Sequence, residues 1–192
     1  MILEKQFKEK LLSQLNTINS NWIDGDSEQR NGSKVDLVNH RLKIVIELKD
    51  DTKHKINLPN KPGVFVENDQ DLTVMNARLN DDIRSANKKF KNYPDYKTIL
   101  LFRTEFFIAD VFRYALEGLH TYSLPRDKDE KLKYVGRKTK YSPFIRKEIG
   151  CFIVWTDDRY YISNELARPQ RVLEKEEIEK LFNLKFKNVN QI

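Results

Sequence analysis

The sequence of 192 residues is poor in several residue types on which large classes of protein depend. Its one cysteine, Cys151, excludes a disulfide framework within the chain and a cysteine-rich zinc site. Its three histidines, His40, His54 and His120, lack the spacing of metal ligands, and there is no phosphate-binding glycine loop or Gly-x-Ser-x-Gly elbow. Every apolar run is short and the N-terminus is charged, so we expect no membrane span, no signal peptide and a cytoplasmic protein.

The net charge of +6 is concentrated in one segment, residues 126–147. Nine basic residues in this segment stand against three acidic residues, a balance equal to the charge of the whole chain. Aromatic residues lie between the charges and offer stacking surfaces beside phosphate contacts. The segment is either a solvated loop, as most charged runs are, or a contact for nucleic acid. The candidate nucleic-acid-binding residues are Lys133, Arg137, Lys138, Lys140, Tyr141, Arg146 and Lys147.

The most informative run is Ile-Val-Ile-Glu-Leu-Lys at residues 44–49, an apolar, β-branched segment that predicts a strand. The alternation of side chains along a strand places Glu47 and Lys49 side by side on one face. If His40 and the residue after it form the turn of a hairpin, Asp36 lies on the neighbouring strand and its carboxylate approaches that of Glu47. We therefore predict that two carboxylates and an ammonium converge.

These residue types suit a divalent metal acting on a phosphodiester. Mg²⁺ takes oxygen ligands, usually one or two carboxylates together with waters and substrate phosphate. Asp36 and Glu47 would supply the carboxylates, and Lys49 would orient the attacking water or stabilise the transition state. Glu-x-Lys alone is a weak pattern in so charged a chain, and the other interpretation is a half-exposed strand with a solvated face. Only the Glu47 copy ends an apolar run that follows a strand-like segment carrying an Asp.

The two segments Ser33-Lys34-Val35-Asp36-Leu37-Val38 and Ile44-Val45-Ile46-Glu47-Leu48-Lys49 resemble the motif of the PD-(D/E)xK nuclease superfamily, the fold of many restriction endonucleases, junction resolvases and repair nucleases. The resemblance implies that Asp36 and Glu47 bind metal, that Leu48 is a further metal-binding position and that Lys49 assists catalysis. It also implies Mg²⁺ as the cofactor, with Mn²⁺ able to substitute. Val35 stands where the motif has proline, at a position that varies within the superfamily.

The first helix offers a further acidic candidate. Apolar residues recur at intervals of three and four over residues 2–20, which predicts an amphipathic helix. At about 100° per residue, Glu4 falls within the apolar stripe and Glu9 falls on the opposite side. The superfamily often adds an acidic residue from its first helix, so Glu4 is a candidate catalytic residue. The other interpretation is a helix N-terminal acid that interacts favourably with the helix dipole.

The predicted fold is α/β: a restriction-endonuclease-like core of αβββαβ type over residues 1–104, with a central mixed β-sheet flanked by helices. The first of its three central strands must come from residues 22–30, a polar and turn-like stretch, so that strand is either short or the topology is altered. Residues 105–192 are expected to pack on the same domain as an extension. The other expected elements are strands at 34–39, 43–49 and 97–102, a long loop at 52–71, helices at 73–92, 105–119 and 172–184, a hairpin tip at 135–138, and a hairpin of 150–155 with 159–162.

The interpretation that joins these features is a metal-dependent endonuclease that hydrolyses DNA, with RNA left open as a substrate. Two alternatives remain at this point. One is a nucleic-acid-binding or assembly protein on the same fold without activity, and the other is a protein-interaction module with a basic face. Many members of the superfamily act as dimers because two strands need two sites, which leaves a homodimer open.

Overall fold

The structure is a computed structural model, and it describes residues 2–28, 34–50, 69–104 and 146–188. Over these ranges the elements follow one another in a simple order. They are α1 (Ile2–Ile18), β1 (Trp22–Asp24), the 3₁₀ helix η1 (Gly25–Ser27), β2 (Leu37–Asn39), β3 (Ile44–Asp50), α2 (Asp69–Phe90), β4 (Lys97–Arg103), β5 (Cys151–Trp155), β6 (Arg159–Ser163), the 3₁₀ helix η3 (Pro169–Arg171), α4 (Lys175–Phe182) and β7 (Lys187–Asn188).

The strands of the described ranges form one mixed sheet of seven, in which each strand lies beside its neighbour in sequence. At the centre β3, β4 and β5 are parallel. The strands β1 and β2 continue antiparallel from β3, while β6 is antiparallel to β5 and β7 is parallel to β6. Because the three central strands run the same way, their carboxyl ends lie at the same edge of the sheet. At that edge Lys49 pairs with Phe102 and Asp50 pairs with Arg103.

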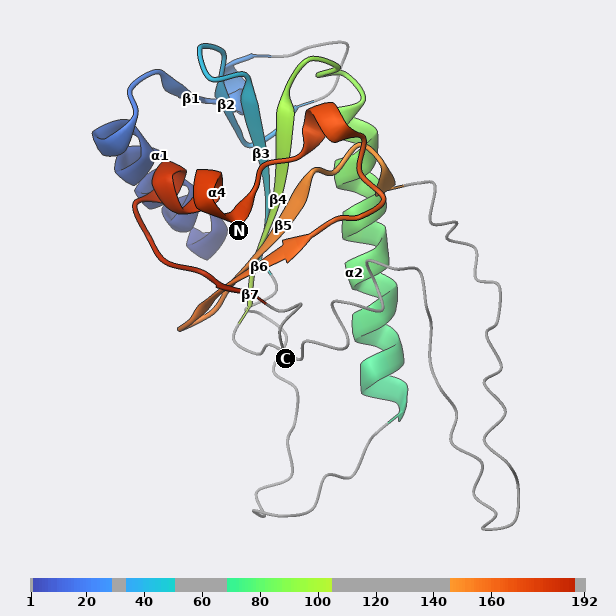
Figure 1. The fold of residues 1–192 in the computed structure, drawn as a ribbon. Helices are drawn as coiled ribbons and strands as arrows, with labels where there is room; N and C mark the ends of the chain where they lie inside the picture. Colours follow the sequence, from blue (N-terminus) through green and yellow to red (C-terminus); the bar gives the residue numbers. More distant parts are fainter. Residues whose placement is uncertain (1, 29–33, 51–68, 105–145, 189–192) are drawn as a thin grey trace, which may run out of the picture.

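Helices cover both faces of the sheet: α1 and α4 lie on one face, and α2 lies on the other (Figure 1). We call these the α1 face and the α2 face. Each has its own buried core: Ile46 packs with Leu15 on the α1 face, while Val45 packs with Ile83 on the α2 face. Successive residues of β3 thus enter opposite cores, as expected of a strand buried on both sides.

The α/β class and the mixed central sheet predicted from the sequence are confirmed. The hairpin turn between β2 and β3 and the hairpin of β5 with β6 are also where the sequence placed them. Helix α2 begins at Asp69, four residues before the expected start. Two expected elements lie outside the described residues, the helix at 105–119 and the hairpin tip at 135–138. The expected loop at 52–71 also lies outside them as far as residue 68, and its last three residues belong to α2.

The strand expected from the polar stretch at 22–30 is β1, and it is short. It pairs with β2 over three residues and then turns at once into η1. The Asp24 carboxylate accepts a 2.8 Å hydrogen bond from the Asp26 N–H, so this polar side chain ends the strand and starts the turn. The alternation of apolar and polar residues that marks a strand does not show in three residues followed by a turn, so the sequence gives little sign of β1.

A buried arginine ties the end of α2 to the C-terminal part of the chain. The Arg171 side chain is 1% exposed, and its guanidinium donates to the backbone carbonyls of Phe90, Tyr93 and Tyr96. Its charge is balanced by Glu148, 2.8 Å away. Carbonyls at a helix C-terminus lack partners within the helix, so the guanidinium satisfies groups that burial would otherwise leave unpaired. This contact fixes α2, which carries two side chains of the site described next.

Candidate active site

The site begins with the alternation of β3, which points Glu47 and Lys49 to the α2 face as predicted. Glu47 is 1% exposed, although it is a carboxylic acid in a strand with apolar neighbours. Its neighbour in the same row, Val45, belongs to the core of the α2 face. A carboxylate with so little water around it needs charged or hydrogen-bonding partners.

Asp36 is brought to the same strand end by backbone contacts. The Gly25 N–H donates to the Asp36 carbonyl at 2.9 Å, and a side chain at position 25 would collide with the Val35 carbonyl, since its Cβ would lie 1.9 Å from that oxygen. The Asp36 carboxylate then accepts a 2.8 Å hydrogen bond from the Leu48 N–H. Asp36 is therefore anchored beside the strand residue that lies between Glu47 and Lys49.

The two oxygens of the Glu47 carboxylate have different surroundings. Oε1 lies 2.5 Å from the Lys89 Nζ and 3.2 Å from the Lys49 Nζ. Oε2 is buried and has no hydrogen-bond partner among the described residues. Burial, followed by the nearby charge of Asp36, raises the pKa of Glu47 to about 7, against the opposing effect of the two lysines. Burial thus disfavours the charged form of Glu47 more than its two lysines stabilise it.

Lys49 lies between two carboxylates. Its Nζ is 3.2 Å from Glu47 and 3.6 Å from Asp82 of α2, and its side chain is 19% exposed. Burial disfavours the ammonium, but the charges of Glu47 and Asp82 outweigh it, so the pKa of Lys49 is raised above its usual value. At neutral pH Lys49 is a cation that donates hydrogen bonds and cannot act as a general base.

Helix α1 contributes a lysine to the site, Lys8. Its Nζ lies 2.6 Å from Asp24, 2.9 Å from Asp26 and 3.9 Å from Asp36. Burial is outweighed by these carboxylates, which raise the pKa of Lys8. The sequence pointed to Glu4 as the helix residue of the site. Glu4 is in α1, but its side chain lies outside what the structure describes, so its role stays a prediction.

Asp36 and Glu47 are the residues of this site that would hold a small divalent cation. Both offer carboxylate oxygens, and the Glu47 Oε2 is a buried acceptor that has no donor among the described residues. Leu48 buries its side chain on the α1 face, yet its N–H points toward Asp36, and the N–H and C=O of one strand residue point to the same side. Its carbonyl is the group that could join the carboxylates as a hard oxygen ligand. No group of three or more His, Cys, Asp and Glu side chains is placed to hold a metal within the described ranges, so waters and substrate would complete the shell.

The structure describes two of the seven candidate nucleic-acid-binding residues. Lys147 is exposed. Arg146 is 2% exposed, and its guanidinium donates a 2.9 Å hydrogen bond to the Asn80 side chain of α2. Arg146 thus packs between elements of the interior, and its part in nucleic-acid binding stays a prediction. Lys133, Arg137, Lys138, Lys140 and Tyr141 lie outside the described residues.

Sequence reasoning missed the partners that α2 and α1 supply. Asp82 and Lys89 are seven residues apart on one side of α2, in the row that also contains the buried Ala86. That spacing was the available signal, but a charged pair beside a core stripe more often marks a solvated face. Lys8 of α1 was missed for the same reason, because a lysine beside a core stripe is usually solvated.

Comparison with models of protein families, with curated proteins and with solved structures finds no match. No helix among the described residues combines the length and the apolar character needed to cross a membrane.

The pH dependence of stability gives a first test of the Glu47 environment. The pKa of Glu47 is higher in the folded chain, about 7, than its ordinary 4.5, so the fold favours the neutral acid. This contribution is present below about pH 4.5 and is lost as the pH rises through 7, by about 3 kcal/mol. We expect metal-free protein to lose this stability in urea unfolding between about pH 5 and pH 8, whereas Glu47→Gln should not. Parallel pH profiles of the two proteins would contradict the assignment.

Proposed function

We propose that this protein is a Mg²⁺-dependent nuclease that hydrolyses phosphodiester bonds in DNA, on a restriction-endonuclease-like core. The observation that carries the proposal is the buried Glu47 Oε2, which has no hydrogen-bond partner in the described part of the chain and lies beside Asp36 and Lys49 at the carboxyl end of a central strand. The element order of residues 2–103, α-β-β-β-α-β around the strand that carries Glu47, supports the same proposal. The basic segment favours a nucleic acid as the polymer. DNA as that nucleic acid, a cytoplasmic location and a homodimer are further parts of the proposal.

The chain's own groups would divide the work. Asp36, Glu47 and the Leu48 carbonyl would hold the ion, which when bound polarises the phosphate and lowers the pKa of a water. Lys49, an ammonium at neutral pH, would orient the attacking water and stabilise the negative charge that builds on the phosphate. Asp82 positions Lys49 from the α2 side. Lys89 would neutralise Glu47 when no cation is present.

A second candidate function has one observation in its favour. The Glu47 Oε1 already contacts two ammonium groups, Lys49 and Lys89, an arrangement that serves a structural ion-pair cluster as well as a catalytic one. On that account the chain binds nucleic acid without cutting it. The lysines then stabilise the fold, and no divalent ion is required.

Digestion of a panel of labelled substrates separates the two functions. Duplex, single-stranded and junction DNA and matching RNA would be incubated with the purified chain and Mg²⁺, Mn²⁺ or EDTA. The proposed nuclease cuts at least one DNA with either metal and none in EDTA. Binding without metal-dependent cleavage of any member of the panel would support the second candidate and overturn the first.

A further inference from the structure

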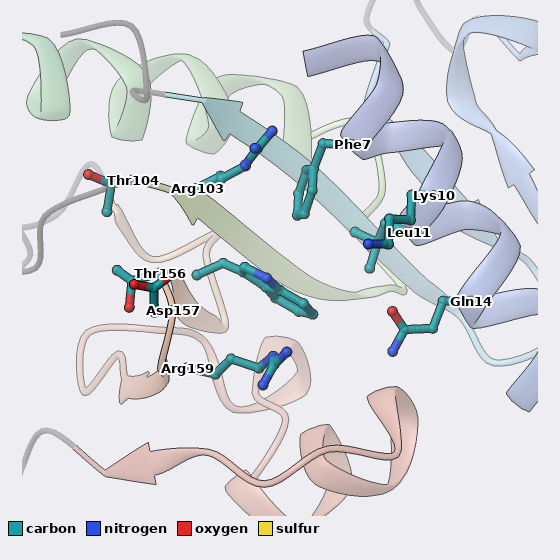
Figure 2. A pocket seen from close by; sticks show the side chains of 10 residues that line it. Phe7, Lys10, Leu11, Gln14, Arg103, Thr104, Thr156, Asp157 and Arg159 are labelled. Atoms are coloured by element: carbon teal, nitrogen blue, oxygen red, sulfur yellow. The ribbon is translucent and has the colours of Figure 1, made fainter. Parts of the chain in front are cut away.

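A pocket of about 650 Å³ lies on the α1 face at the carboxyl edge of the sheet, and none of the residues of the candidate active site lines it. Figure 2 shows Phe7 of α1 beside Arg103 at the end of β4, with Arg159 of β6 across the pocket. Lys10 and Gln14 reach in from α1, and the turn after β5 closes one side. Pockets of this volume hold ligands of small-molecule size.

The pocket is built from alternating aromatic and cationic groups. Phe7 and Trp155 meet edge to face, with ring centroids 5.8 Å apart. The Arg103 guanidinium lies 4.9 Å from the Phe7 centroid, and that of Arg159 lies 4.8 Å from the Trp155 centroid. Because Arg159 stacks on the Trp155 ring, the edge of its guanidinium remains available to donate to a planar or anionic ligand. The lining therefore offers flat surfaces and positive charge together.

Two cations of this pocket, Lys10 and Arg159, form no ion pair within the described ranges. The Arg159 Nε is buried and has no hydrogen-bond partner among the described residues. Lys10 is exposed at the rim, and no ion pair is formed by it within the described ranges. The lining also contains Arg103, which pairs with Asp50, and one acid, Asp157, so Lys10 and Arg159 are the donors left for a ligand. A ligand that brings acceptor oxygens would satisfy these donors.

The pocket and the candidate active site share one edge of the sheet. Arg103 pairs in register with Asp50, the residue after Lys49, and its guanidinium lies 3.5 Å from the Asp50 carboxylate. Lys49 faces α2 and Asp50 faces α1, because neighbouring strand residues point to opposite faces. A polymer that crosses the ends of β3 and β4 would touch the site on one face and the pocket on the other.

We propose that this pocket binds an unpaired nucleotide of the DNA, with its base against the Phe7 and Trp155 rings and its phosphate on Arg159 and Lys10. The inference rests on the proposed nucleic-acid substrate, although it requires no cleavage. An unpaired base presents a free face for stacking, which a paired and stacked duplex base does not. The protein would therefore prefer DNA with a single-stranded tail next to the duplex that is cut.

Binding in EDTA tests this independently of activity. The full chain would be titrated into two labelled hairpins whose strands are joined by a non-nucleotide linker, one with a blunt end and one with a five-nucleotide tail at that end. The wild type is expected to bind a tailed hairpin about tenfold more tightly, the order expected from one stacked base. Arg159→Gln and Phe7→Leu should remove most of this preference. Lys5→Gln, which removes a charge from the exposed side of the same helix, should keep it.

A fluorescence measurement tests the inference even where a variant of the pocket fails to fold. Trp22 is 3% exposed, so in a Trp22→Phe background the remaining Trp155 reports on the pocket. The tailed hairpin should quench this emission and the blunt one should not. Equal wild-type affinity for both hairpins, or a preference that survives Arg159→Gln, would overturn the inference. Failure to bind either DNA would overturn both the inference and the proposed function. A preference for the tailed DNA without cleavage in Mg²⁺ would support the inference and overturn only the proposed nuclease activity.

Discussion

Replacing Glu47 with glutamine, or Asp36 with asparagine, is expected to abolish Mn²⁺ binding and to lower the cleavage rate roughly 1,000-fold or more, since a catalytic metal supplies several kcal/mol of transition-state stabilisation. The change is nearly isosteric, so the fold should persist. Glu47→Gln should also raise the stability of the metal-free protein at about pH 8, because it removes an ionised group that burial disfavours. Calorimetric titration with Mn²⁺ and a single-turnover cleavage assay measure the two losses.

The matched control for this prediction is Glu9→Gln on α1. Glu9 is an acid whose side chain is 63% exposed and pairs weakly with Lys5, away from the site. This variant should bind Mn²⁺ and cut DNA as the wild type does. Undiminished Mn²⁺ binding by both Glu47→Gln and Asp36→Asn would remove these residues from the metal site.

Lys49→Met is expected to behave differently from the ligand variants. Removing a positioned ammonium should lower the turnover number by about 100-fold to 1,000-fold, as the loss of one charge-stabilising donor does in other active sites. Metal binding should persist, because an ammonium does not coordinate a cation and its removal takes a competing charge from Glu47. Substrate affinity should change little, since the effect falls on the transition state.

Two controls sharpen the Lys49 prediction. Lys5→Met removes a charge from a side chain that is 78% exposed and should leave turnover unchanged. Lys49→Arg keeps the positive charge but replaces a compact ammonium by a broad planar group between Glu47 and Asp82, so it should recover part of the activity. A Lys49→Met enzyme that cuts at the wild-type rate would exclude the proposed role.

The strand β3 and the residues on each of its two faces could be predicted from the sequence because they depend on local periodicity. Ile44, Ile46 and Leu48 enter one core and Val45 enters the other, as alternation requires. The hairpin that carries Asp36 beside β3 followed from a turn of suitable length between two apolar runs. The hydrogen bond from the Leu48 N–H to the Asp36 carboxylate is a consequence of that register.

The rest of the site depends on contacts between distant segments, which periodicity does not report. Lys89 meets Glu47 across 42 positions of sequence, and Lys8 meets Asp26 across 18. Each lysine looks like one of many surface charges until the packing of its helix is known. The surroundings of Arg146 could not be predicted either. It belongs to a basic run, but packing turns its side chain to Asn80 in the interior.

The central claim is that Asp36 and Glu47 share one divalent ion, and an anomalous difference map from Mn²⁺-soaked crystals tests it most directly. The account predicts a peak at about 2.1 Å from carboxylate oxygens of both residues, with the Leu48 carbonyl as a further ligand. The peak should be absent from crystals of Glu47→Gln treated in the same way. A wild-type map with no peak between these carboxylates, and with Lys49 and Lys89 still paired to Glu47, would contradict the claim.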